Sequence, residues 1–106
     1  MIINVLGEEY VLVKSNAVSD PKLEHNDGYC DHTVKMIVID TFQETELSVG
    51  DLAEYEKQVI RHELIHAFLH ESGLSDCSWA KNEEIVDWIA LQFPKMMKVF
   101  EEHKCL

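Results

Sequence analysis

The chain of 106 residues has little of several residue types that define other classes of protein. Four glycines and two prolines are too few for a collagen-like or low-complexity chain. Three scattered cysteines without a CxxC pair, Cys30, Cys77 and Cys105, argue against a disulfide framework and favour a reducing compartment. The longest apolar runs, such as residues 36–39, have the length of a strand, so the sequence contains no membrane-spanning run.

Basic residues are also scarce. Nine Lys and Arg stand against 20 Asp and Glu, which gives a formal net charge of −11. This charge repels nucleic acid and anionic lipid, so we expect neither a nucleic-acid nor a membrane partner. The N-terminus has no basic segment followed by a long apolar one, which argues against export, and we expect a cytoplasmic protein.

The residues that are present describe one globular domain over residues 1–106. Hydrophobic residues make up 46% of the chain and charged residues 27%. A domain of this size buries a smaller share of its surface than a large one, so a bound metal could add to its stability. The composition does not indicate an oligomeric state.

The first forty residues have the pattern of strands. Residues 2–6 and 10–14 flank a turn at Gly7 and predict a hairpin. Residues 28–32 are a further strand candidate, and residues 34–42 are the clearest one. We predict that the strand in 34–42 forms a sheet edge able to bind an extended peptide by strand addition.

The second half has the pattern of helices. Ser48, with Asp51 three residues later, resembles a capping box, and apolar residues then recur at helical spacing. We expect this helix over about residues 51–72, ended by Gly73. Strands followed by helices predict an α+β domain in which a small, mostly antiparallel sheet packs on the helices.

A second helix is expected over about residues 79–92. Ser78 is its candidate N-cap. Pro94 is expected to end it, because proline cannot donate a helical hydrogen bond. A short last helix over about residues 96–100 then completes the chain.

One motif on the first predicted helix carries chemistry. Residues 61–71 read RHELIHAFLHE and contain the HExxH pattern. His62 and His66 are one turn apart on the same helix face, so both imidazoles can reach one metal ion. Glu63 is offset by about 100° around the helix. Its carboxylate would therefore lie beside the metal and could take a proton from a bound water, as in a metallopeptidase.

A third ligand is needed, because catalytic zinc usually has three protein ligands and a water. The second helix offers Glu83, with Glu84 as the alternative at the neighbouring position. Asp87 is one turn further on and could accept a hydrogen bond from His62. We expect one Zn²⁺ per chain, although two histidines and a carboxylate also suit iron(II) in other folds.

The two motifs, HELIHAF and NEEIVDWIA, together resemble those of the gluzincins, the HExxH metallopeptidases typified by thermolysin. This resemblance implies that His62, His66 and Glu83 are the zinc ligands. It also implies that Glu63 is the general base and that Asp87 supports the first histidine. The metzincin pattern H-E-x-x-H-x-x-G-x-x-H is absent, so the third ligand does not come from the first helix.

The chain also resembles the small ImmA/IrrE-type metallopeptidases of phages and mobile elements. They share a short, strand-rich N-terminus, a histidine four residues after HExxH, here His70, and an alanine that closes the second motif, here Ala90. His70 is about 12 Å along the helix from His62 and cannot share its ion. We expect a structural role for His70, with lining of a groove as the alternative.

The other polar candidates have no diagnostic spacing. His25, Cys30 and His32 match no standard metal knuckle, so we interpret them as loop residues. A stabiliser for the oxyanion of a peptidase could be any of five residues, and the spacing selects none of them. They are Tyr29, Tyr55, His25, His32 and His103.

These patterns favour a zinc-dependent peptidase acting on a peptide or protein substrate. The first alternative is a zinc-stabilised regulatory or assembly protein of phage or mobile-element origin with little or no proteolytic activity. The second is a helical interaction module in which the HExxH pattern is accidental.

Overall fold

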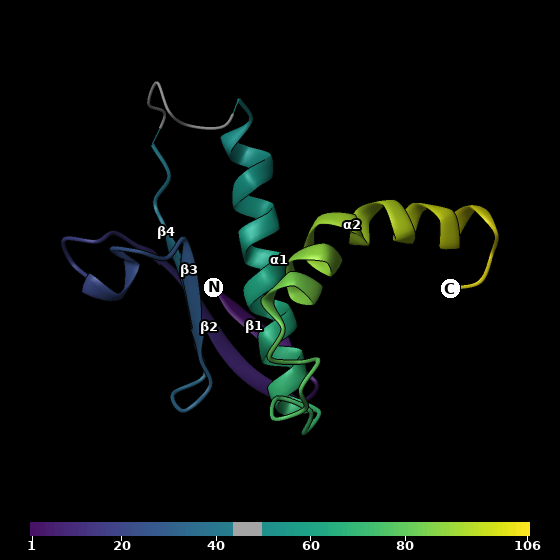
Figure 1. Cartoon of the computed structure of the whole chain (residues 1–106), viewed down its shortest axis with the longest axis horizontal. Coiled ribbons are helices and arrows are strands. Elements are labelled where there is room, and N and C mark those ends of the chain that lie inside the picture. Colours follow the sequence, from purple (N-terminus) through teal and green to yellow (C-terminus); the bar gives the residue numbers. More distant parts are fainter. Residues whose placement is uncertain (44–49) are drawn as a thin grey trace.

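The computed structural model describes residues 1–43 and 50–106 and has an α+β fold, as predicted. The strands are β1 (Ile2–Val5), β2 (Glu8–Ser15), β3 (Gly28–Asp31) and β4 (Met36–Asp40), and the helices are η1 (Pro21–Leu23), α1 (Leu52–Glu71) and α2 (Glu83–Glu102). The sheet has the order β1-β2-β4-β3. In Figure 1, α1 lies between the sheet and α2.

The sheet is mixed. β1 pairs with β2 and β3 pairs with β4 in antiparallel fashion, whereas β2 and β4 are parallel. The predicted first hairpin is confirmed. Its turn consists of Leu6 and Gly7, which have φ angles of 51° and 92°. Positive φ at both positions is typical of the tight turns that join two antiparallel strands.

The predicted position of the strand in residues 34–42 is wrong. β4 is an interior strand between β2 and β3, and the edge strands of the sheet are β1 and β3. Ile37, Val38 and Ile39 are all buried. A continuous apolar run of this kind is typical of a strand covered on both faces, which explains why β4 is not exposed at an edge.

Helix α1 begins where the sequence predicted. Asp51 is its N-cap and accepts a hydrogen bond from the backbone N–H of Glu54, while the proposed cap Ser48 lies outside the described residues. At the other end Gly73 has a φ of 77°, and the N–H of Leu74 donates to the carbonyl of Leu69. This is the glycine-terminated end that the sequence indicated.

The core lies between α1 and the sheet. Buried Val5, Tyr10, Leu12, Ile37, Ile39 and Ala67 form one cluster, with partly buried residues of α1 packed against it. The hydroxyl of Tyr10 donates to Glu71 at 2.8 Å, which connects β2 to the last turn of α1. The helix thus has a fixed rotation relative to the sheet, and this rotation decides which side chains face β3.

Helix α2 differs from its prediction at both ends. It begins at Glu83, because the side chain of Asn82 caps it by accepting from the backbone N–H groups of Glu84 and Ile85. The sequence predicted that the helix starts after Ser78, but residues 75–81 form irregular turns that precede it. Pro94 lies inside the helix, which continues to Glu102 and includes the predicted separate last segment.

A contact between the two helices explains why Pro94 does not end α2. Proline has no N–H to donate to the carbonyl four residues earlier, which is that of Ala90. The Nε of Arg61 donates to that carbonyl at 2.6 Å instead. A side chain of α1 therefore satisfies the group that proline leaves unpaired, and α2 extends away from the rest of the chain beyond this point (Figure 1).

Neither helix of the described residues has the length and apolar character needed to cross a membrane.

Gly28 allows the close approach of β3 to its neighbours. A Cβ at this position would lie 3.0 Å from the carbonyl oxygen of Val38 and 3.2 Å from a methyl group of Val59 on α1. We expect Gly28→Ala to lower the free energy of unfolding by about 1–3 kcal/mol, measured by urea denaturation, because the backbone of β4 cannot move away. Gly50→Ala is the control, since nothing lies within 4 Å of that position. Equal losses in the two variants would contradict this account.

Candidate metal centre

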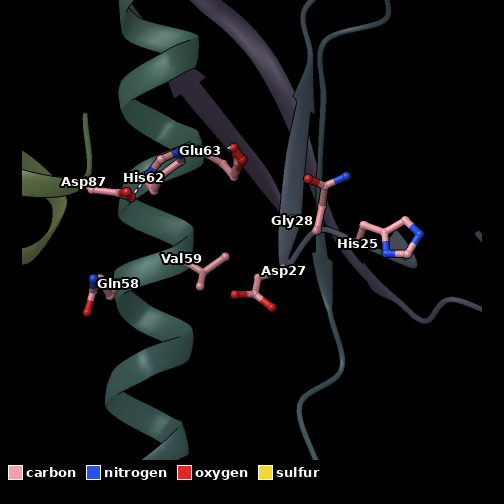
Figure 2. Close-up of a pocket in the computed structure, with 9 residues that line it drawn as sticks. His25, Asp27, Gly28, Gln58, Val59, His62, Glu63 and Asp87 are labelled. Atoms are coloured by element: carbon pink, nitrogen blue, oxygen red, sulfur yellow. Dashed lines mark ion pairs between the residues drawn. The ribbon is translucent and has the colours of Figure 1, made fainter. Parts of the chain in front are cut away.

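One face of α1 presents the three polar residues of the HExxH motif toward β3 and α2. His62 and His66 have side chains that are 19% and 26% exposed, so their rings are held by packing but remain accessible. Glu63 is 5% exposed and points from α1 toward β3 (Figure 2). The predicted helical spacing therefore places the imidazoles and the carboxylate beside one another.

The first turn of α2 brings Glu83 to the two histidines. One oxygen of Glu83 lies 2.8 Å from Nε2 of His62, and the other lies 3.1 Å from Nε2 of His66. The two Nε2 atoms are 3.2 Å apart. Within the described residues, these three form the group of metal-binding side chains whose ligand atoms lie within 4.8 Å of one another. The alternative ligand Glu84 is not in this group.

The spacing of these atoms fits a metal ion. Bonds of 2.0–2.1 Å at tetrahedral angles separate neighbouring ligand atoms by about 3.3 Å. The Oε2 atom of Glu83 lies 2.8 Å from Nε2 of His62 and 3.3 Å from Nε2 of His66, and these separations, with the 3.2 Å between the two nitrogens, are close to that value. Two histidines and one carboxylate also match the protein ligands of many catalytic zinc sites. The group can hold a metal ion.

Asp87 fixes the orientation of His62. Its Oδ1 lies 2.7 Å from Nδ1 of His62, and Figure 2 shows Asp87 reaching this ring from α2. A carboxylate at this distance keeps the proton on Nδ1. The Nε2 atom is then unprotonated and faces Glu83 and His66, as a metal ligand must.

Glu63 is an uncompensated buried carboxylate. Its Oε2 is buried and has no hydrogen-bond partner among the described residues. Burial raises the pKa of Glu63, and the nearby carboxylates of Glu83 and Asp87 raise it further, against the lowering effect of His62 and His66. A buried acceptor without a partner is unfavourable for stability, which indicates a role for this oxygen toward a ligand.

Two cavities between α1 and β3 meet at this group. The larger, of about 470 Å³, is lined by the metal-binding group together with Cys30, His32 and His70. The smaller, of about 230 Å³, is lined by Asp27, Gln58 and Val59 beside His62 and Asp87 (Figure 2). Glu63 lines both cavities, so it is reachable along the length of the cleft.

The structure separates the remaining candidates. The hydroxyls of Tyr29 and Tyr55 are hydrogen-bonded to Asp20 and Asp27. His103 caps the far end of α2. His25 lines the smaller cavity, although its ring points away from α1 in Figure 2. Of the five oxyanion candidates, Tyr29 and His32 line the larger cavity.

His70 has the role that the sequence gave only as an alternative, because it lines the larger cavity. His32 stacks on it, with ring centroids 3.9 Å apart and planes at 22°. Sequence reasoning missed this pair. His70 follows His66 by one helical turn, which was a usable signal, but the position of His32 depends on the turn after β3.

Comparison of the chain with family models, with curated proteins and with solved structures finds no match.

The buried charge of Glu63 has a consequence for stability in the metal-free protein. Because the folded state raises the pKa of Glu63, it binds this proton more tightly than the unfolded chain does. The carboxylate therefore lowers stability progressively as the pH rises from the ordinary glutamate pKa to the raised one, and has its full effect above the raised pKa. We expect Glu63→Gln to raise the melting temperature of the chelator-treated protein by a few degrees at about pH 7.5, and by less near pH 5.

Glu84→Gln is the matched control, since Glu84 is exposed on the same turn as Glu83. It should leave the melting temperature unchanged. A Glu63→Gln protein that melts below the wild type at both pH values would contradict the buried-charge account.

Proposed function

We propose that the chain is a zinc-dependent peptidase of gluzincin type. The observation that carries the proposal is the buried, unpartnered carboxylate of Glu63 beside three convergent ligand atoms. A site that only stabilised the fold would need the three ligands but no further buried carboxylate beside them. The free cysteines, which form no disulfide, agree with a cytoplasmic location.

Each residue has a role in this reaction. His62, His66 and Glu83 would hold the zinc, which would polarise a peptide carbonyl and acidify a water molecule. Glu63, with Oε1 4.0 Å from Nε2 of His62, is placed to take the proton of that water and pass it to the leaving amine. Its raised pKa favours uptake of the proton from water, because the protonated form is less costly in a buried site. Asp87 keeps His62 in the required tautomer.

The substrate would lie along β3 and not along β4. β3 is one of the two edge strands of the sheet, and residues of this strand line both cavities. An extended peptide could pair with the free side of β3 and pass the metal-binding group. The strand that would pair with the peptide is therefore β3, whereas the sequence predicted β4.

A second candidate function is a zinc-stabilised regulatory or assembly protein of phage or mobile-element origin. Exposed apolar side chains on α2, namely Trp88, Leu91, Phe93, Val99 and Phe100, favour it. Such a surface is typical of a protein that binds a partner. The two functions differ in their need for Glu63.

The third ligand can be tested by metal content. We expect the wild type to retain about one zinc per chain, measured by mass spectrometry after purification without chelator. Glu83→Ala should lose most of this zinc, because it removes a ligand, whereas Glu84→Ala should retain it. Loss of zinc in Glu84→Ala with retention in Glu83→Ala would assign the ligand to the neighbouring position instead.

The peptidase function can be tested with Glu63→Gln. This change should retain zinc but lower kcat/KM about 10²–10⁴-fold on a fluorescence-quenched peptide library, because the proton acceptor is removed. Asn82→Ser, which keeps an N-cap, is the matched control and should retain activity. If the zinc-loaded wild type cleaves no peptide and Glu63→Gln is biologically active, the non-proteolytic candidate is correct.

A further inference from the structure

The stacked pair of His32 and His70 lines the cleft but has no role in the reaction proposed above. Both rings line the larger cavity together with His62, His66 and Glu63. Their centroids are 3.9 Å apart and their planes nearly parallel. The backbone at His32 is fixed, because the N–H of Thr33 donates to the side chain of Asp31 at 3.0 Å. The pair is therefore a defined part of the cavity wall.

The pair does not have the geometry of a second metal site. The in-plane lone pairs of two stacked rings lie in two nearly parallel planes, so they do not converge on one ion. Among the described residues, neither ring belongs to a group of three metal-binding side chains. The nearest carboxylate, Glu71, already accepts from Tyr10 at 2.8 Å and from Lys35 at 3.3 Å.

The hydrogen-bonding state of His70 makes the pair a donor. Its Nδ1 is buried and has no hydrogen-bond partner among the described residues. Burying an unpaired N–H costs more free energy than burying an unpaired, unprotonated nitrogen. The proton of the neutral ring is therefore assigned to Nε2. That atom is 4.0 Å from Glu71, which is beyond hydrogen-bonding distance. An N–H of His70 is thus available to a ligand.

The N–H groups of the pair favour a ligand that accepts hydrogen bonds. The carboxylates that line this cavity are Glu63 and Glu83, and both have roles at the metal. Ser75 and Cys30 also line the cavity and carry no negative charge as a hydroxyl and a thiol, since burial, followed by the field of Glu63, raises the pKa of Cys30 to about 12. An ionised carboxylate accepts a stronger hydrogen bond from an imidazole N–H than a neutral acceptor does, so it is the class of ligand that fits the pair best.

We propose that the stacked His32–His70 pair binds a carboxylate of the substrate next to the scissile bond. This inference rests on the peptidase function proposed above and names the substrate class of that site. His70 is four residues, about 6 Å, beyond His66 along the helix. Same-side residues of an extended peptide are two positions and about 6.6 Å apart, so a carboxylate carried by the second residue from the scissile carbonyl, or by the long side chain of the first, can reach the pair.

The carboxylate has two possible sources, an acidic side chain or the free C-terminus of a short peptide. Both offer the same chemistry to the imidazole N–H groups. The net charge of −11 does not prevent binding, because exposed charges further away than about 8 Å are screened at physiological salt.

Peptide hydroxamates test the proposal without turnover, because the hydroxamate binds zinc directly. One pair of probes has Glu or Gln beside the hydroxamate and an amidated C-terminus. A second pair has a neutral residue and either a free carboxylate or an amide at the C-terminus. Isothermal titration calorimetry with the zinc-loaded protein compares the wild type with His32→Gln and His70→Gln. His103→Gln is the matched control, since His103 lies at the end of α2.

We expect one acidic probe to bind about tenfold more tightly than its neutral partner, and the pair in which this occurs identifies the source. His32→Gln and His70→Gln should remove this preference while leaving the affinity for the neutral probe unchanged. His32 is exposed, so its replacement tests the proposal even if His70→Gln fails to fold.

Two other results overturn the proposal and differ in what else they affect. Equal affinities within both pairs, with hydroxamates still bound, would reject the carboxylate site and leave the peptidase function intact. No hydroxamate binding, in a protein that takes up no zinc, would reject both.

Discussion

The placement of the first turn of α2 against α1 is the constraint on which the candidate site depends. HExxH supplies two imidazoles from one helix, but the third ligand must come from another element. Asn82 sets the first residue of α2, so that Glu83 and Asp87 lie on successive turns facing His62. The buried residues Val86 and Ala90 lie in the part of α2 that packs on α1. The bond from Arg61 to the Ala90 carbonyl holds the same region and makes Pro94 tolerable.

The site also imposes costs that the rest of the fold accommodates. Glu63 is buried with an unpaired oxygen, and the carboxylates of Glu83 and Asp87 lie near it in a chain that is already acidic. A bound cation would offset both, which agrees with an acidic protein that builds its cleft around a metal-binding group. On the side of the cleft that faces α1, β3 approaches closely at Gly28. The edge strand β3 and helix α1 therefore enclose Glu63.

The sequence was sufficient for features that depend on local spacing. The hairpin at Gly7, the limits of α1 and the placement of His62 and His66 side by side follow from short-range patterns. Spacing alone left Glu83 and Glu84 as alternatives, and the structure groups Glu83 with the two histidines. Features that depend on distant contacts were missed. The prediction that Pro94 ends a helix failed because the compensating hydrogen bond from Arg61 joins residues far apart in the chain. The prediction that β4 is an edge strand failed because strand order depends on tertiary contacts. The His32–His70 stack was missed because it joins a turn to a helix.

The most direct test of the metal centre is X-ray absorption spectroscopy at the zinc edge of the protein loaded with one equivalent of zinc. The geometry predicts a first shell of nitrogen and oxygen at about 2.0–2.1 Å, with the outer-shell scattering of two imidazoles and no sulfur. A sulfur scatterer at about 2.3 Å would show that a cysteine such as Cys30 binds the metal. A shell without imidazole scattering would likewise contradict a centre built on His62 and His66.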